Sequence, residues 1–234
     1  MSHLVKPPIS LGFYFNGLDA HIDIPTPSYF LWGSTPKTVC LWLWTRAYNP
    51  DKTMMPFSTG VGQTRRDWSL FIRTDGSYQL NTWADDLRTS TKARLQEWDF
   101  VCMWYDGDVT IKLYVNGVQA GVKTLGGVLD TAQSIVRLGA YSRSLDYFYN
   151  GIVGECIAFN RALSETEMEE IRTLRRNIMD GCVLKLGKVG LVKGGGSKWL
   201  DESGYSHHGD VYGAVRVRCC HCNPVVLYGS ATPI

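Results

Sequence analysis

Residues 98–121 contain two runs in which side chains alternate between two faces, and the second run places Ile111 and Leu113 on the same face. A period of two residues is typical of strands that bury one side. Asn116 and Gly117 end the second run. An Asn-Gly pair favours a type I′ turn, because that turn needs a positive φ at both central residues. This stretch therefore predicts a β-hairpin, and it indicates a chain built from antiparallel strands.

About a dozen short runs of this kind recur along the chain. Residues 38–45 are apolar on both faces, so they are predicted to form a central strand. The 8 Trp, 12 Tyr and 24 Gly residues suit strands and turns. One all-β domain can reach 234 residues and bury roughly 70% of its unfolded surface, which is enough for a core without disulfides. Strands at this spacing predict an all-β sandwich of two sheets.

One segment departs from the strand pattern. Ser164 and Glu167 have the spacing of a capping box, in which each side chain binds the backbone amide of the other residue. Apolar residues then recur at helical spacing, while acidic residues occupy the first turn and arginines the last turns, as the helix dipole favours. We expect one short surface helix over about residues 165–177. Its apolar stripe consists of Met168, Ile171, Leu174 and Ile178.

The overall charge gives no reason to expect a polyanionic partner. The chain has 24 basic and 22 acidic residues and a net charge of +2, so neither nucleic acid nor an anionic membrane is indicated. No run of 18 apolar residues occurs, and no membrane insertion is expected. The first 15 residues contain two prolines and no apolar segment, so no secretory signal peptide is predicted. The protein is expected to be mature, intracellular or released by another route.

Six of the seven cysteines fall into two groups. Cys40, Cys102 and Cys156 lie inside apolar strands, where a free buried thiol behaves as a small apolar side chain. We expect these three to be free thiols.

The second group lies near the end of the chain, at Cys219, Cys220 and Cys222, with His221 among them. Three states remain open for this cluster: a disulfide with another cysteine, free thiols, or a zinc site. Zinc is the least favoured, because a tetrahedral site usually takes two separated ligand pairs. The upstream pair at residues 207–208 could supply two histidines to such a site.

Four segments, residues 11–25, 38–44, 98–118 and 151–171, together resemble a known family. They resemble, in order and spacing, the opening F-D-G strand, the T-I-S-x-W-V strand, the W-H-H-V-A-V-T-Y-D-G hairpin and the N-R-A-L-S-x-E-E element of laminin-G-like domains. Those domains belong to the concanavalin A-like lectin/glucanase superfamily. The resemblance covers about residues 10–175. It implies a concanavalin A-like jelly-roll β-sandwich with one short surface helix.

A fifth segment resembles the same family but occurs at a different place in the chain. Residues 199–214 resemble the W-x-D-x-S-G element, which in these domains usually precedes the F-D-G strand. We therefore divide the chain into a laminin-G-like sandwich with its terminal helix, residues 1–178, and a C-terminal extension, residues 179–234. The extension is predicted to complete the same sandwich or to pair with a neighbouring subunit. Pairing within the chain is favoured, because the connection after the helix is short.

The resemblance also implies a calcium site near the D-x-S-G element. Asp201 matches the first acid, and Tyr205 and His208 occupy the matching places after it. Glu155 lies beside Gly154, which takes the position of a second family acid. The alternative is a plain turn in which Asp201 accepts hydrogen bonds from local amides. Calcium is thus the cofactor that the resemblance implies.

Glycan binding needs aromatic platforms with polar groups nearby, and the family includes domains that bind glycans or proteins. The candidates are Trp68, Tyr78, Trp83 and Tyr147, the last within the aromatic segment 141–149. Any single Trp is nevertheless more often buried than exposed.

Catalytic signatures are missing from the sequence. Sandwich glucanases carry their carboxylates as E-x-D-x-E on one strand, and no such triplet occurs here. Asp85 and Asp86 are adjacent, so in a strand they would point to opposite faces. No G-x-S-x-G nucleophile motif is present. We expect no enzyme activity, and a glycoside hydrolase is only a remote alternative.

Two functions of different classes fit these observations. The first, which we favour at this point, is a non-enzymatic structural or adhesive component of a virion or cell-surface assembly, located outside the cell or on the virion. The second is a soluble, calcium-assisted glycan-binding module. The expected partners are accordingly a glycan or further subunits of the assembly. A homo-oligomer is compatible with both functions. The fold alone does not decide between them.

Overall fold

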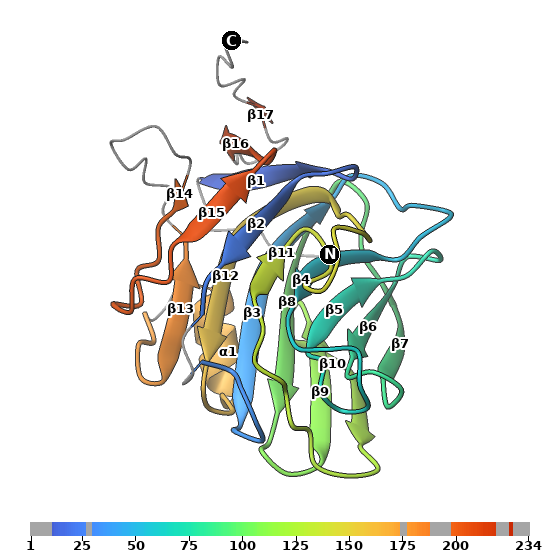
Figure 1. Cartoon of the computed structure of the whole chain (residues 1–234), viewed down its shortest axis with the longest axis vertical. Coiled ribbons are helices and arrows are strands. Elements are labelled where there is room, and N and C mark those ends of the chain that lie inside the picture. Colours follow the sequence, from blue (N-terminus) through green and yellow to red (C-terminus); the bar gives the residue numbers. More distant parts are fainter. Residues whose placement is uncertain (1–10, 27–29, 174–176, 188–197, 219–224, 227–234) are drawn as a thin grey trace.

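The computed structural model describes residues 11–26, 30–173, 177–187, 198–218 and 225–226. Two antiparallel sheets lie face to face and enclose the main apolar core (Figure 1). Phe15, Leu41, Leu70 and Leu138 are among the completely buried side chains of this core. The predicted all-β sandwich is therefore confirmed, and it contains both the strands predicted from the period-two pattern and those formed by the C-terminal extension.

The first sheet has nine strands, in the order β10, β9, β8, β3, β12, β1, β16 and β17, with β13 also paired to β12. These strands are β1 (Leu11–Asn16), β3 (Lys37–Thr45), β8 (Trp98–Tyr105), β9 (Thr110–Val115), β10 (Val118–Thr124), β12 (Asn150–Phe159), β13 (Cys182–Leu186), β16 (Val215–Arg218) and β17 (Val225–Val226).

The second sheet has eight strands, in the order β14, β15, β2, β11, β4, β5, β6 and β7. These strands are β2 (His21–Ile24), β4 (Met54–Ser58), β5 (Ser69–Ile72), β6 (Ser77–Asn81), β7 (Leu87–Lys92), β11 (Val136–Leu138), β14 (Lys198–Trp199) and β15 (Gly209–Tyr212).

The β9–β10 hairpin forms as the Asn-Gly signal predicts. Asn116 has φ +54° and Gly117 has φ +83°, which is the left-handed conformation at both central residues of the turn. The Asn116 side chain also fixes the turn to β8: its Oδ1 accepts the Phe100 amide at 2.9 Å, and its Nδ2 donates to Asp99 at 2.7 Å. Local turn chemistry and a cross-strand contact therefore favour the same register.

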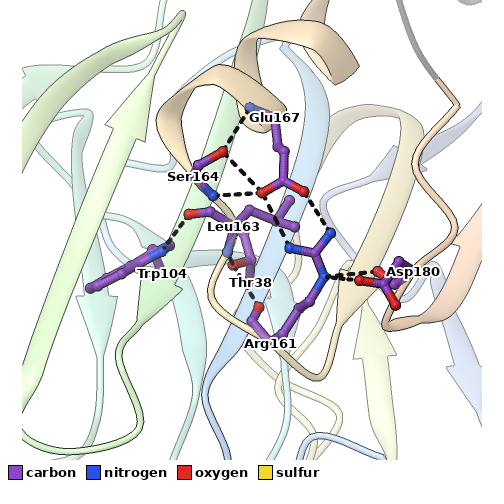
Figure 2. A network of polar contacts seen from close by, with 7 residues as sticks. All are labelled: Thr38, Trp104, Arg161, Leu163, Ser164, Glu167 and Asp180. Atoms are coloured by element: carbon purple, nitrogen blue, oxygen red, sulfur yellow. Dashed lines mark hydrogen bonds and ion pairs between the residues drawn. The ribbon is translucent and has the colours of Figure 1, made fainter.

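The helix α1 (Glu165–Arg172) begins where the capping box predicts and ends earlier than residue 177. Figure 2 shows how its start is tied to the nine-stranded sheet. The Glu167 carboxylate accepts both the Ser164 amide and the Arg161 guanidinium, and Trp104 Nε1 donates to the Leu163 carbonyl at 2.9 Å. Thr173 caps the end of α1. Of the predicted apolar stripe, Met168, Ile171 and Ile178 are buried, whereas Leu174 lies outside the described residues.

A second, smaller core fills the space between α1 and the outer face of the nine-stranded sheet, and it includes Trp42, Phe100 and Met168. This face is covered by the helix and its flanking loop. The outer face of the eight-stranded sheet carries no described helix (Figure 1), so it is the sheet face on which a binding site can be built.

The residues after α1 return to the sandwich within the same chain, in orange to red in Figure 1. Strand β13 pairs antiparallel with β12, β15 pairs with β2, and β16 pairs with β1. Trp199, on β14, is completely buried and lies against Phe13, with ring centroids 5.0 Å apart. These strands cover edges of β12, β2 and β1 that would otherwise expose unpaired backbone amides.

Cys40, Cys102 and Cys156 are free and buried, as predicted. Cys219, Cys220 and Cys222 lie outside the described residues, so the three alternatives for that cluster stay predictions. His207, one of the proposed partners, is buried, with its Nδ1 2.9 Å from the Val183 carbonyl oxygen.

Candidate functional site

The outer face of the eight-stranded sheet is polar where β5 and β6 cross it. The strand period sends Leu70 and Leu80 into the core, and it sends Ser69, Gln79 and Asn81 outward. These outward side chains are nevertheless buried, because loops cover this part of the sheet. Buried polar groups are costly unless they are hydrogen-bonded, so their pairing determines what the face can do.

A continuous series of hydrogen bonds runs across this face. Asn81 Nδ2 donates to Asp67 Oδ1 at 3.0 Å, and Ser69 Oγ donates to the same oxygen at 2.6 Å. Ser69 Oγ also lies 3.0 Å from Ser58 Oγ, which accepts the Ser142 amide at 3.0 Å. The series links β4, β5 and β6 to the loop at residues 139–149. It therefore holds that loop against the sheet.

Asp67 is the centre of this network and is only partly satisfied. Its Oδ2 is buried and, within the described part of the chain, accepts no hydrogen bond; Tyr141 Oη is likewise buried without a partner there. The two groups lie beyond ordinary hydrogen-bond distance, but they are near enough for a weak hydrogen bond from the Tyr141 hydroxyl to lower the pKa of the Asp67 carboxyl. Burial raises the pKa of the Asp67 carboxyl to about 7, against the opposing hydrogen bonds from Ser69 and Asn81. A buried oxygen without a partner at the centre of a rigid network is a feature of functional sites.

Trp83 stands at the surface above this network, 40% exposed. Its φ is +63°, and Ala84 follows with φ +66°, which costs of order 1–3 kcal/mol for a residue with a side chain. The turn is held by Asp86, which accepts the Thr82 amide at 3.0 Å, and by the Trp83 carbonyl, which accepts the Arg65 amide at 3.3 Å. The structure thus fixes an indole in a costly conformation where water can reach it.

Arg143 lies beside Trp83. A Cβ added to Gly62 would lie 2.1 Å from an Arg143 guanidinium nitrogen and 2.9 Å from the Trp83 ring, so the glycine lets both side chains approach the same backbone point. Tyr141 is close enough to Arg143 for the guanidinium to affect its pKa, and it meets Tyr147 edge to face, with ring centroids 6.0 Å apart. We call Trp83, Arg143, Tyr141 and Tyr147 the aromatic rim.

Two of the four residues that were predicted to form exposed platforms for a sugar are buried, so that part of the prediction is wrong. Trp68 and Tyr78 are completely buried, and Tyr78 donates to Asp99 at 3.0 Å inside the sandwich. A ring without exposed surface cannot stack on a sugar. Trp83 and Tyr147 do reach the surface. Trp68 directly precedes β5 and Tyr78 lies on β6, both at positions that face the opposite sheet, whereas Trp83 lies in the β6–β7 turn and Tyr147 in the loop before β12.

Sequence reasoning missed Arg143 and Asp67. The segment at residues 141–149 attracted notice for its tyrosines, and Arg143 lies between them. Little in the linear sequence distinguishes Asp67 from a solvated carboxylate: Ser69 is a local partner two residues away, but Asn81 reaches Asp67 only through the pairing of β5 with β6.

The predicted calcium ligands are used in other ways. Asp201 Oδ1 accepts the Lys185 and Ser203 amides, and Oδ2 accepts the Ser203 hydroxyl and the His207 amide, at 2.6–2.9 Å. Protein donors therefore occupy the carboxylate, as the plain-turn alternative implies. His208 Nδ1 accepts the Asp201 amide at 3.1 Å.

The other two predicted ligands do not complete a site. Tyr205 is exposed and stacks on His207. Glu155 is buried in β12, and burial raises the pKa of its carboxyl to about 7. Among the described residues, no three His, Cys, Asp or Glu side chains come together in a way that could hold a metal ion. The side chains of the described residues thus do not fit a calcium ion. Residues 188–197 are not among the described residues.

Residues 16–169 match a laminin-G family model described as the concanavalin A-like lectin/glucanases superfamily. The match covers well over half of the chain, so this protein belongs to that superfamily. It extends from the end of β1 into α1 and includes strands of both sheets and the aromatic rim. No curated protein sequence matches this chain.

Solved structures share the fold. A candidate carbohydrate-binding protein from Bacteroides ovatus superimposes with a TM-score of 0.70 at 16% identity, over 93% of this chain and 62% of its own. The heptameric SAP-like pentraxin of Limulus polyphemus gives 0.54 at 17%, over 70% and 82%. The CBM40 domain of the Ruminococcus gnavus IT-sialidase gives 0.50 at 16%, over 68% and 96%. This chain thus spans less than two thirds of the Bacteroides protein, and these likenesses concern the fold.

Proposed function

We propose that this protein is a non-catalytic glycan-binding module and that it binds its ligand at the aromatic rim. The observation that carries the proposal is the indole of Trp83, which is exposed and held at positive φ beside Arg143. Strained residues that persist on a surface mark positions where the conformation serves a function. The Bacteroides ovatus and Ruminococcus gnavus proteins, described as a candidate carbohydrate-binding protein and as CBM40, support the same class of ligand.

The rim has the chemistry that sugar recognition needs. An exposed indole offers an apolar face for the C–H side of a pyranose, and a guanidinium offers planar donors for hydroxyl or carboxylate oxygens. The hydrogen bond between the Ser142 amide and Ser58 Oγ fixes the loop that carries Arg143. A preformed site of this kind loses little conformational entropy when the ligand binds.

Four carboxyl groups that are marked out by a raised pKa or by the sequence support binding without catalysis. Glycoside hydrolysis needs two carboxyl groups on either side of one accessible bond. The two whose pKa is raised to about 7 are both buried, and Glu155 lies on β12 of one sheet whereas Asp67 lies beside β5 of the other. Asp85 is engaged with Arg65 and Lys123, and Asp86 accepts from Gln79. None of these carboxyl groups is therefore free to meet a glycosidic oxygen.

A glycan array tests this proposal. The wild-type protein should bind a defined set of oligosaccharides. Trp83→Ala and Arg143→Ala should each weaken that binding at least about tenfold, because stacking and charge-assisted hydrogen bonds are each worth about 1–3 kcal/mol. Tyr212→Ala is the matched control, because Tyr212 is 50% exposed on β15, at the other end of the same sheet. Binding that is equal in all four proteins would contradict the assignment to the rim.

The same array, run with calcium and with a chelator, tests the calcium expectation. If calcium assists binding, the chelator weakens binding and lowers the melting temperature, because an ion bound only by the native state stabilises it. Equal melting curves and equal binding in both buffers would contradict calcium assistance.

A second candidate is a structural or adhesive role in a virion or cell-surface assembly outside the cell. It rests on β10, the edge strand of the nine-stranded sheet, where Val118 is 70% exposed and Val122 is also exposed. Exposed apolar edge strands are templates for pairing with another chain. Light scattering tests this role. If the wild-type protein forms a defined oligomer and Val118→Lys does not, assembly through β10 is supported. If the wild-type protein is a monomer at all concentrations, assembly through β10 is excluded. No described helix is long and apolar enough to cross a membrane.

A further inference from the structure

A cavity of about 280 Å³ opens at one end of the sandwich, and none of the aromatic-rim residues lines it. It lies where the β1–β2 turn, the β3–β4 connection and the start of β12 meet. The lining residues are Asn16, Gly17, Leu18, Tyr48, Asn49, Pro50, Met54, Phe148 and Asn150. No charged side chain is among these lining residues, which makes the cavity different from the rim with its guanidinium. An uncharged cavity that combines amides and aromatic rings has the composition of a small-molecule site.

The aromatic wall of the cavity is fixed in place. Tyr48 Oη donates a hydrogen bond to the Ala93 carbonyl. The same ring packs so closely on Gly76 that a Cβ there would lie 2.3 Å from the ring. Tyr48 therefore stays in one position, and Phe148 lines the cavity with a second ring. A preorganised ring wall lowers the entropic cost of binding a flat, partly apolar ligand.

The side-chain amides of the three asparagines that line the cavity make different hydrogen bonds. Asn16 Oδ1 accepts the Leu18, Asp19 and Ala20 amides, so Asn16 shapes the turn. Its Nδ2 donates to Asp19 at 2.7 Å, so this amide is already engaged on both of its polar atoms.

The side-chain NH₂ groups of Asn49 and Asn150 are not used as donors within the described part of the chain. Asn49 Oδ1 accepts the Asp51 and Lys52 amides, and Asn150 Oδ1 lies 3.5 Å from the Tyr14 hydroxyl. Within the described part of the chain, neither Nδ2 group makes a hydrogen bond. Two backbone amides thus hold the Asn49 oxygen, the Asn150 oxygen has one long contact, and both NH₂ groups remain available to donate to a ligand.

We infer that this cavity is a second binding site and that it takes an uncharged pyranose, such as a hexose residue. The ring's C–H face would lie against Tyr48 or Phe148, and the Nδ2 groups of Asn49 and Asn150 would donate to hydroxyl oxygens. The uncharged lining disfavours a carboxylated sugar, whose desolvated charge would have no partner among these residues. This inference goes beyond the binding proposed at the rim and does not depend on it.

The test is a titration of the ¹⁵N-labelled full chain, followed by the side-chain amide signals of Asn49 and Asn150 in NMR spectra. The probes are glucose, galactose, mannose and N-acetylglucosamine, with glucuronate as the charged comparison. At least one neutral sugar should shift both signals, and glucuronate should bind at least about tenfold more weakly. The double variant Asn49→Asp, Asn150→Asp keeps the accepting oxygens and removes the free donors, so it should weaken neutral-sugar binding by at least about tenfold. Because this variant lacks both side-chain amide signals, its binding is followed through the backbone amide signals of Tyr48 and Phe148, which are recorded for the wild type as well.

The outcomes separate this inference from binding at the rim. Trp83→Ala, which alters the rim, should leave the Asn49 and Asn150 shifts unchanged. If no neutral sugar moves these two signals, if glucuronate binds equally well, or if the double variant binds like the wild type, the inference is wrong. Each of those results stands whether or not the glycan array finds a ligand for the rim.

Discussion

Replacing Asp67 by asparagine should make the protein more stable at pH 8 and should flatten its stability between pH 5 and pH 8. The buried Asp67 carboxyl has its pKa raised from 3.8 to about 7, mainly by desolvation. Between these two values the folded state holds a proton that the unfolded state has released. The contribution of this group to stability is therefore fully present below about pH 4, falls as the pH rises, and is lost once the pH passes about 7.

The size of the effect follows from the pKa shift. Each pKa unit corresponds to about 1.4 kcal/mol, so charging Asp67 costs on the order of 4 kcal/mol at pH 8, of which roughly 2 to 3 kcal/mol appears between pH 5 and pH 8. The amide introduced by Asp67→Asn is never charged. Its oxygen can still accept from Ser69 and Asn81, and its NH₂ group supplies a donor near Tyr141 Oη, which has no partner within ordinary hydrogen-bond distance in the described chain.

Urea unfolding at pH 5 and pH 8 measures this difference. Glu155 titrates over the same range, so the relevant quantity is the wild-type value minus the Asp67→Asn value at each pH. Asp51→Asn serves as the control, because Asp51 is an exposed carboxylate and its replacement should matter little at either pH. The reasoning fails if Asp67→Asn changes the free energy of unfolding by the same amount at both pH values.

Three further outcomes are expected. Gly117→Val should lower the free energy of unfolding by about 1–3 kcal/mol, because Gly117 has φ +83°; denaturant unfolding checks this, and a change below roughly 0.5 kcal/mol would contradict it. Ser164→Ala should cost about 1 kcal/mol in the same assay through loss of the helix cap, with Thr166→Ala, outside the capping box, as the comparison. Deleting residues 180–234 should cause aggregation or a lower melting temperature; a monomer of unchanged stability would count against pairing of β13, β15 and β16 with the sandwich.

The sequence was sufficient where local chemistry and tertiary structure favour the same conformation. Asn116 and Gly117 predict the β9–β10 turn, because few other residue pairs tolerate two consecutive positive φ angles. Ser164 and Glu167 predict the start of α1 for a similar reason: both partners of the capping box lie within one turn. The end of the helix was less predictable, since Thr173 caps it within a stretch whose periodicity continues.

The candidate site was predictable only in part. The rim residues Trp83 and Tyr147 were predicted from their ring chemistry, together with Trp68 and Tyr78, which the structure buries. The sequence carries the period of a strand but does not state which of its two faces meets the opposite sheet. A shift of one residue in register exchanges the two faces, so the burial of an individual ring is a property of the packed sandwich.

The sequence by itself determined the alternating strands, the β9–β10 hairpin and the capped helix, because each depends on neighbours a few residues apart in the chain. The tertiary structure alone decided the position of the candidate binding surfaces. Asp67 meets Asn81 through the pairing of β5 and β6, Arg143 meets Trp83 at Gly62, and Asn49 and Asn150 line the same cavity at the end of the sandwich. These contacts join residues up to about a hundred positions apart, and only the closing of the sheets brings them together.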